Sequence, residues 1–415
     1  MNAVKLNANK AVRPKTRAAT TGQIKSGSGK AGGAGPEVSR HDHHKKLVAG
    51  GLGDWWPGIQ LYYPPIKHAP ASGIYEDMKK ASARMKKHAH ETKAHTLIFD
   101  LEDGCRQKQM SRDLLRLELP TLQRYFQRVG KKVTIAIRVN SFRTEEYDLD
   151  LKLVREMGDH IEVVMLAKAG EAYGAAEVRD LSSVLQGINP AITVQPIIEH
   201  PKSLKIAHEL MQYSTVKHVV FGIHDFSKAM AIDITPENWM EELQYYLNQL
   251  MFEARIAGKG VIGGVETLLG DRCLPETLVE PQAVRHWLEE HGDREARIVY
   301  KHACAEAAMG LTGKQVIHPD HIHLCKAAYT PAPSEVSRKV RILKAAIAAD
   351  ALVGGAIKFE GEMLDPPMFA KALQTLLRAH ALRALRREDA EFAMHVLGLL
   401  PAQVARQNWP YGVLL

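Results

Sequence analysis

Short apolar segments rich in Val and Ile alternate along the chain with amphipathic segments, and this alternation limits the possible folds more than any other feature. The apolar segments are residues 58–65, 95–103, 133–140, 161–169, 192–200, 217–225, 260–266 and 313–320. Helical spacing of apolar residues marks the segments between them, for example 76–90, 202–212 and 237–257. Strands that alternate with helices form right-handed βαβ units and a parallel sheet. Eight such strands within about 265 residues match a closed (β/α)₈ barrel in number and size.

A doubly wound open sheet is the alternative for the same alternation. It is disfavoured because no Gly-rich phosphate-binding fingerprint follows the first apolar segment. We therefore predict a TIM barrel as the catalytic domain over residues 51–330. The remaining residues, 331–415, begin with the Pro-containing TPAPSEVS, which carries a helix N-cap signal, and continue as helices interrupted near GEMLDPPMF. They are predicted to form a small helical C-terminal domain that serves as a lid or in oligomerisation.

The excess of basic residues is concentrated at the N-terminus. The net charge is +8 over 415 residues, and residues 1–36 hold seven Lys and Arg and no Asp or Glu. The rest of the chain holds 48 Lys and Arg against 47 Asp and Glu, so it is close to neutral. Because the Gly, Ser, Ala and Lys of the tail bury little apolar surface, residues 1–50 are predicted to be a disordered basic tail. No aromatic residue is interleaved with this charge, so no nucleic-acid partner is predicted.

The composition also disfavours membrane and disulfide-rich classes of protein. No run of about 18 apolar residues is present, so no membrane span is predicted. The best candidate, 342–357, is interrupted by Lys344 and Asp350. The four cysteines form no CxxC pair, which is typical of a chain in a reducing compartment. We expect a cytoplasmic protein, and the acid-poor tail leaves organelle targeting open.

Charged or chelating side chains stand where the apolar segments end. They are Glu102, Asp103, Arg138, Asn140, Lys168, Glu199, His224, Asp225, Glu266 and His318. The carboxyl ends of the strands form the active-site face of a TIM barrel, so these side chains should converge. Crowded carboxylates repel one another unless a cation lies between them, which indicates a divalent ion such as Mg²⁺. With Arg138 suited to a substrate carboxylate, the pattern predicts a metal-assisted site that stabilises an enolate or alkoxide of a small acid.

Each of these residues also has a structural explanation when it is taken alone. Glu199 could cap the helix that follows Pro201, and Asp225 could be a helix N-cap. Lys168 could be an ion-pair partner with no functional role. The functional interpretation depends on so many polar strand ends meeting at one mouth.

Five motifs resemble the citrate lyase β-subunit-like lyases of the HpcH/HpaI aldolase superfamily, a family that includes malyl-CoA and citramalyl-CoA lyases. They are LIFDLEDG (97–104), AIRVN (136–140), PIIEH (196–200), FGIHDF (221–226) and GKQVIHPDHI (313–322). The stretches KAAYTPAPSEV (326–336) and FEGEMLDPP (359–367) extend the resemblance into the C-terminal segment. It covers residues 57–375 in the order of the family.

The resemblance implies a Mg²⁺-dependent carbon–carbon lyase. Such enzymes reversibly split a hydroxy diacid, held as a CoA thioester such as malyl-, citramalyl- or citryl-CoA, into an acyl-CoA and a 2-oxo acid. The family pattern implies the following roles: Glu199 and Asp225 as metal ligands, Arg138 as the group that binds the oxo acid, and Glu102 and Asp103 as the pair that positions metal-bound water and substrate.

The resemblance also implies a role for the C-terminal segment. The Asp of the family's GxMxD motif falls on Asp365, and it is expected to act as acid or base in the site of a neighbouring subunit. A homotrimer or homohexamer is therefore expected.

Three departures from the family pattern affect the substrate. The first strand contains Gln60 where an Arg-Ser pair is usual nearby, Lys168 follows Ala in place of Pro, and His224 replaces a Glu. Lys168 and His224 are therefore predicted to bind an altered head group. Two alternatives stay open: a CoA-independent aldolase of a free hydroxy acid, and a non-catalytic homologue that acts as a binding subunit. Retention of the expected metal ligands and of Asp365 disfavours the second.

Overall fold

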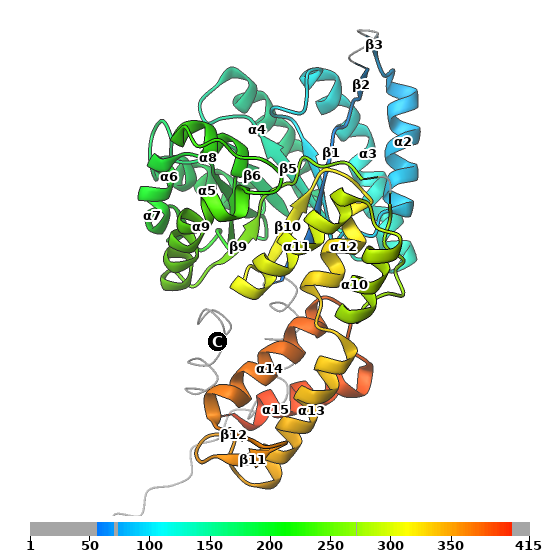
Figure 1. The fold of residues 1–415 in the computed structure, drawn as a ribbon. Coiled ribbons are helices and arrows are strands. Elements are labelled where there is room, and N and C mark those ends of the chain that lie inside the picture. The colour runs from blue at the N-terminus through cyan, green and yellow to red at the C-terminus, as the bar shows by residue number, and fades with distance from the viewer. Residues whose placement is uncertain (1–55, 70–73, 271, 401–415) are drawn as a thin grey trace, which may run out of the picture. The chain divides into compact units, whose positions relative to one another are not determined.

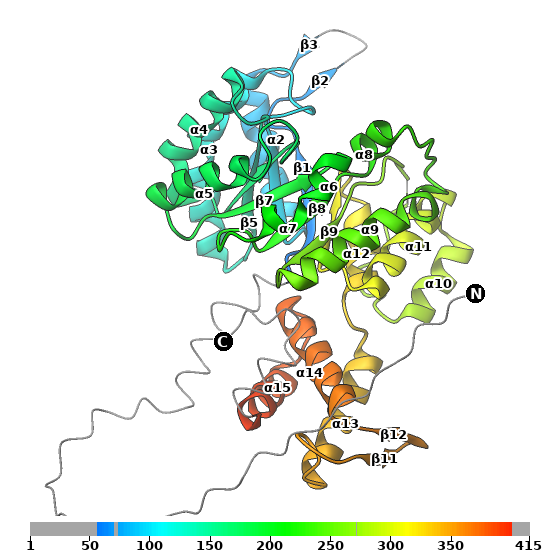
Figure 2. The same ribbon diagram turned by 90° about the vertical axis from the view of Figure 1, so that its left-hand side faces the viewer.

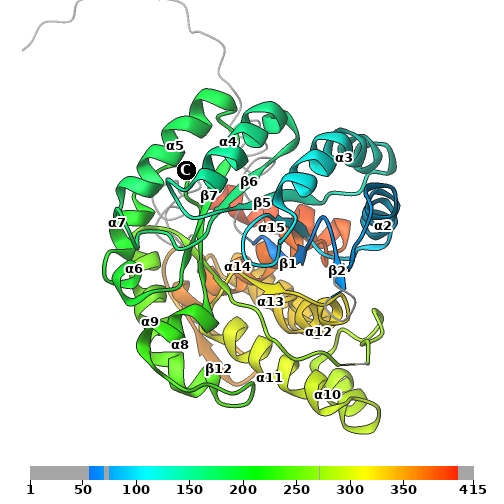
Figure 3. The ribbon, with the colours of Figure 1, turned by 90° about the horizontal axis from the view of Figure 1, so that it is seen from above.

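A closed barrel of eight parallel strands forms the larger part of the structure, a computed structural model that describes residues 56–69, 74–270 and 272–400 (Figure 1). Seen from above, the barrel's helices surround its strands (Figure 3). The prediction of a TIM barrel is thus confirmed. The predicted basic tail, residues 1–50, lies outside the described residues.

Each of the eight predicted apolar segments contains one barrel strand. The strands are β1 (Gly58–Tyr63), β4 (Thr96–Asp100), β5 (Thr134–Val139), β6 (Val163–Leu166), β7 (Thr193–Ile198), β8 (His218–Phe221), β9 (Gly260–Gly263) and β10 (Gly313–Val316). Neighbours in the barrel follow chain order, and β1 closes the ring by pairing with both β4 and β10. A short hairpin of β2 (His68–Ala69) and β3 (Ile74–Tyr75) follows β1.

The strands are buried on both faces, which explains why their apolar residues run without alternation. In β4, Ile98 belongs to an interior cluster, whereas Leu97 and Phe99 pack into the larger cluster that includes the helices. The interior cluster takes one buried residue from each of six strands: Ile98, Ala136, Met165, Ile197, Val220 and Ile262. The barrel is therefore filled with side chains, and a site is possible only at its ends.

Helices follow the strands. They are α2 (Met78–Glu91), α3 (Lys108–Val129), α4 (Glu145–Met157), α5 (Ala176–Ile188), α6 (Pro201–Lys205), α7 (Ala207–Met211), α8 (Ile223–Met230), α9 (Trp239–Ile256), α10 (Pro281–Glu290), α11 (Arg294–Met309) and α12 (His321–Tyr329), with a 3₁₀ turn at Gly158–His160. The segment 202–212 divides at Ile206 (φ −110°, ψ 18°) into α6 and α7, so the single helix predicted there is wrong. No helix of the described ranges is both long and apolar enough to cross a membrane.

The C-terminal segment contains α13 (Pro333–Ala348), α14 (Pro366–Ala381) and α15 (Arg387–Leu399), as the prediction of a helical segment requires. The interruption near GEMLDPPMF is a β-hairpin of β11 (Ile357–Phe359) and β12 (Glu362–Leu364), which lies beside α13 (Figure 2). Its two turn residues, Glu360 (φ 48°) and Gly361 (φ 85°), both have positive φ, which is typical of a tight hairpin turn.

Candidate active site at the carboxyl ends of the strands

The pairing of β4 with β5 brings the first two charged groups of the site together. Asp100 and Arg138 are partners in the register. Arg138 Nε and Nη2 each donate to one oxygen of the Asp100 carboxylate at 2.7 Å, and Nη1 lies 3.2 Å from Glu102. The Tyr62 ring covers the guanidinium, with its centroid 4.9 Å away, and its hydroxyl donates to Gln315 Oε1 at 3.1 Å. Arg138 is thus held in one orientation on three sides.

The turn after β4 carries the predicted acidic pair. The Asp100 carboxylate accepts hydrogen bonds from the amides of Glu102 (3.0 Å) and Gly104 (3.1 Å). A Cβ at position 104 would lie 2.3 Å from Asp100 Oδ2, so the turn requires glycine there. The Glu102 side chain is 5% exposed, whereas that of Asp103 is 64% exposed. The turn therefore presents one buried and one solvated carboxylate.

Lys168, which follows β6, connects this acidic pair to the next strands. Its φ of 52° is left-handed, a strained conformation for a residue other than glycine. Its ammonium forms an ion pair with Glu102 and lies 3.3 Å from Asp103. Burial raises the pKa of Glu102. Burial of the Lys168 ammonium acts to lower its pKa, but the hydrogen bond to Glu102 and the charges of Glu102, Glu199 and Asp103 together outweigh burial and raise it.

Glu199 directly follows β7 and, like Asp100 and Glu102, is a buried carboxylate of the site. Its Oε1 accepts the backbone amide of Lys168, and the residue is 6% exposed. Burial raises the pKa of Glu199 to about 8, and the nearby Asp225 and Glu102 contribute to the rise. A Cβ at Gly222 would lie 2.6 Å from Glu199 Cβ and 3.1 Å from its Oε2. A glycine at position 222 is therefore what leaves room for this carboxylate.

Asp225 and His224 lie in the first turn of α8. Asp225 is partly exposed and His224 is exposed. The N-cap of α8 is Gly222, without a side-chain cap bond, so Asp225 is not the N-cap. Likewise, His200 and not Glu199 caps α6, because its Nδ1 accepts the amide of Lys202 at 3.1 Å. The helix-cap explanations that the sequence left open for Glu199 and Asp225 are therefore wrong, whereas Lys168 does form an ion pair, with Glu102.

The donor set of Glu199 and Asp225 suits a hard divalent cation. Mg²⁺ commonly binds one or two protein carboxylates and completes its shell with water and substrate oxygens. Arg138 and Lys168 balance two charges among Asp100, Glu102 and Asp103, and the two further carboxylates leave an excess of negative charge. Nowhere in residues 56–69, 74–270 and 272–400 do three or more His, Cys, Asp or Glu side chains form a complete ligand group. The ion would therefore rest on two carboxylates and on ligands from outside the chain.

Asp365 is not part of this constellation. It precedes Pro366 at the start of α14, with no side-chain cap bond. Within the described part of the chain its Oδ1 is buried and has no hydrogen-bond partner. The strand ends thus bring Glu102, Asp103, Arg138, Lys168 and Glu199 into one connected group with Asp225 near Glu199, whereas Asp365 belongs to the C-terminal segment.

A cavity of 1810 Å³ opens at the opposite end of the barrel, where strands begin, and its lining includes Thr96, Thr134 and Thr193. None of the predicted site residues lines it. The cavity is therefore separate from the carboxylates described above.

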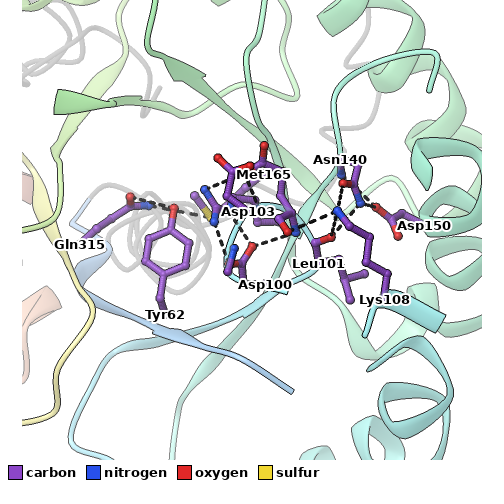
Figure 4. Close-up of polar contacts among 12 residues, drawn as sticks. Tyr62, Asp100, Leu101, Asp103, Lys108, Asn140, Asp150, Met165 and Gln315 are labelled. Atoms are coloured by element: carbon purple, nitrogen blue, oxygen red, sulfur yellow. Dashed lines mark hydrogen bonds and ion pairs between the residues drawn. The ribbon is translucent and has the colours of Figure 1, made fainter. Parts of the chain in front are cut away.

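Sequence reasoning missed several polar residues of the site. They are Tyr62, Asp100, Lys108, Asp150 and Gln315, all drawn in Figure 4. Asp100 had a detectable signal, since it is a carboxylate at a strand end two residues before Glu102. Lys108 lies in α3 and Asp150 in α4. Only the folded structure brings them to Asn140 at the end of β5, so no local sequence pattern reveals them. Glu266, which was predicted at the mouth of the barrel, lies instead in a second buried polar cluster at α9, β9, β10 and α11. The other members of this cluster, Trp239, His302, Glu306 and Lys314, were missed.

Comparison with known proteins finds one family model that matches this chain. The family model described as HpcH/HpaI aldolase/citrate lyase matches residues 78–272, which include every predicted site residue except Asp365. Residues 78–272 are thus similar in sequence to the HpcH/HpaI aldolase/citrate lyase family. The family resemblance of the motifs is thereby confirmed.

Two curated relatives and one solved structure illustrate the similarity. A citrate lyase subunit beta-like protein of Deinococcus radiodurans is 26% identical over 285 residues, 69% of this chain and 89% of the relative. A (3S)-malyl-CoA thioesterase of Cereibacter sphaeroides is 24% identical over 295 residues, 71% of this chain and 89% of the relative. The structure of CitE from Mycobacterium tuberculosis with magnesium, acetoacetate and coenzyme A matches with a TM-score of 0.53 at 20% identity, covering 78% of this chain and 98% of CitE. The structural likeness concerns the fold.

Proposed function

We propose that this protein is a Mg²⁺-dependent carbon–carbon lyase that cleaves a hydroxy diacid, held as its CoA thioester, into an acyl-CoA and a 2-oxo acid. The observation that carries the proposal is the Glu199 carboxylate, buried at a strand end beside Asp225 and hydrogen-bonded by a backbone amide. A buried carboxylate that stays largely protonated without a cation is a poor structural element but a good ligand for a hard cation.

The names of the relatives support the substrate class. They refer to citrate lyase and to a malyl-CoA thioester, and CitE was crystallised with magnesium and coenzyme A. Citrate and malate are both hydroxy acids with more than one carboxylate. We therefore propose a thioester of such an acid as the substrate of this chain.

Glu199 and Asp225 would hold the Mg²⁺. When bound there, the ion supplies Lewis-acid polarisation of the substrate hydroxyl and of the carbonyl that forms from it. Arg138 would bind the carboxylate of the oxo-acid part through an N–H of Nη1 beside its contact with Glu102, since Asp100 already occupies Nε and Nη2. Tyr62 keeps the guanidinium flat against its ring, so the direction of this contact is fixed before substrate arrives.

Glu102 and Asp103 would orient a water or substrate hydroxyl at the edge of the metal site. Burial raises the pKa of Glu102, and the charges of Arg138 and Lys168 oppose that rise. Lys168 and the exposed His224 also lie where the head group of the substrate would enter.

We further propose that Asp365 completes the site of a second copy in a homotrimer or homohexamer. Its unpartnered Oδ1, in a segment that forms its own hydrophobic cluster, supports a function that is not intramolecular. There the carboxylate would transfer a proton to or from the acyl carbon next to the thioester.

A direct assay tests the proposal. Malyl-, citramalyl- and citryl-CoA and the corresponding free acids are incubated with the full-length protein and Mg²⁺, and 2-oxo acid and free thiol are measured separately. We expect release of 2-oxo acid from one thioester, its loss with EDTA, and its loss in Asp225→Ala and Asp365→Ala.

The other outcomes are informative. Release of free CoA thiol without 2-oxo acid would identify a thioesterase. Turnover of free acids alone would identify a CoA-independent aldolase. A protein that binds Mg²⁺ but converts none of these compounds would favour a non-catalytic binding subunit.

A further inference from the structure

Lys108, which the sequence did not indicate as a site residue, bonds the backbone of the turn that carries Glu102 and Asp103. Lys108 Nζ donates to the backbone carbonyls of Leu101 (3.0 Å) and Glu102 (3.3 Å), and it also bonds the side-chain oxygen of Asn140. An ammonium has three N–H donors. All three are therefore engaged within the protein, and none is left for a substrate.

The position of Lys108 in its helix is electrostatically unfavourable. It is the first residue of α3, and the partial positive charge at a helix N-terminus repels a cation there. The N-cap of α3, Gln107, makes no side-chain cap bond. Local helix energetics therefore do not explain a lysine at this position, whereas its bonds to the turn do.

A buried network fixes the partner of Lys108. Asn140 Nδ2 donates to the Leu101 carbonyl at 2.8 Å and to Asp150 Oδ2 at 2.7 Å, and its backbone amide donates to the same Asp150 oxygen at 2.9 Å. Asp150 is completely buried, and its other oxygen accepts from Arg112 at 2.7 Å. Figure 4 shows Leu101, Lys108, Asn140 and Asp150 as one continuous group of polar contacts. Every polar atom of the Asn140 side chain is thus used to lock the turn.

We propose that Lys108 is a positioning residue, whose ammonium holds the backbone of the turn after β4 so that Glu102 and Asp103 point into the site. The role rests on the proposed function, because it matters only if these carboxylates orient water or substrate. Lys108 acts on the path of the backbone between Asp100 and Cys105, and Glu199 and Asp225 belong to other strands. Loss of Lys108 should therefore alter the acidic pair and leave the metal ligands in place.

Hydrogen exchange of the turn tests the structural half of the proposal without any substrate. The amides of Glu102, Asp103, Gly104 and Cys105 are all hydrogen-bonded within the turn. In Lys108→Met, which keeps the length of the side chain, we expect exchange of the peptide 101–106 to rise about tenfold. Peptides that contain Glu199 and Asp225 should exchange as before, and the melting temperature should change by only about 2–4 °C.

Lys131→Met is the matched control. Lys131 Nζ donates to two backbone carbonyls, those of Ala89 (3.0 Å) and His90 (2.9 Å), but it lies away from the site. This variant should leave exchange of the 101–106 peptide unchanged. An unchanged peptide in Lys108→Met, or a rise that spreads over the whole barrel together with a large fall in melting temperature, would overturn the positioning role.

Kinetics tests the functional half. Lys108→Met should lower kcat about 10- to 100-fold while the calorimetric affinity for Mg²⁺ stays within about twofold, and Lys108→Arg should recover part of kcat. Equal losses of Mg²⁺ affinity and kcat would contradict the assignment. If the wild-type protein has no lyase activity, the proposed function fails, and the exchange experiment still decides whether Lys108 holds the turn.

Discussion

Among the site residues, Glu199 is a carboxylate whose ionisation is clearly opposed by its surroundings. Its pKa of about 8 in the metal-free protein lies above the ordinary value of 4.5 because the side chain is buried beside Asp225. The folded protein therefore retains a proton that the unfolded chain releases. The stabilising effect of this proton is complete at low pH and is lost as the pH rises through about 8.

The first prediction follows from this proton. Mg²⁺ binding at pH 7 should release up to one proton from Glu199, because the ion and the proton compete for the same carboxylate. Calorimetric titration in two buffers of different ionisation enthalpy measures the number released. In Glu199→Gln the release should vanish and the affinity should fall at least about 100-fold. Binding without proton release in the wild type would place the ion elsewhere.

A second prediction concerns Gly222. Because its missing Cβ leaves the space that Glu199 occupies, Gly222→Ala should displace that carboxylate and weaken Mg²⁺ binding by about 10- to 100-fold. Gly187→Ala is the control, since nothing lies within 4 Å of a Cβ there and the residue is in the last turn of α5. It should leave binding unchanged and stabilise the protein by about 0.5–1 kcal/mol. Equal affinities in the two variants would contradict the role of Gly222.

At the scale of elements, the sequence predicts the strands, which follow from the pattern of apolar residues. It does not predict contacts between strands, which depend on their register. All eight strands lie within predicted segments because their apolar runs are buried on both faces. The bidentate pairing of Arg138 with Asp100 requires the register of β4 and β5, which no local pattern specifies. The hairpin of β11 and β12 was hidden because Glu360-Gly361 is a less usual pair for a tight turn than Asn-Gly or Asp-Gly.

The third prediction concerns Lys314 in β10, for which the sequence indicates no special role. Lys314 is completely buried and bonds Glu306 (2.9 Å), Glu266 (3.4 Å) and the Gly264 carbonyl (2.9 Å), so its charge links β9, β10 and α11. Lys314→Met would leave two buried carboxylates without their cation. Urea unfolding should show a loss of about 3–5 kcal/mol.

The double variant Lys314→Met, Glu306→Gln provides the control for this cluster. It removes one of the stranded charges, so it should recover part of the stability lost in the single variant. Additive losses would show that Lys314 contributes through packing alone.

At the scale of the whole molecule, the proposed role of Asp365 requires a second copy of the chain. If its carboxylate acts in a second copy, Asp365→Ala and Arg138→Ala should each be inactive alone, and refolding them together should restore activity. Random mixing in a closed ring gives about a quarter of the sites both intact halves. The regained rate after co-refolding, compared with each variant refolded alone, measures this fraction. No recovery in a mixed oligomer would assign Asp365 to its own chain.

The ring of strands also determines the order in which a growing chain can complete it. β1 is paired on one edge with β4 and on the other with β10, where Gly58 lies opposite Gly313. During synthesis, the outer edges of β1 and β9 therefore stay open until the last barrel strand leaves the ribosome. The strands that carry Asp100, Arg138 and Glu199 can pair much earlier. A weakened β10 would thus leave exposed edges that favour aggregation of the nascent chain, even though the acidic half of the site had already formed.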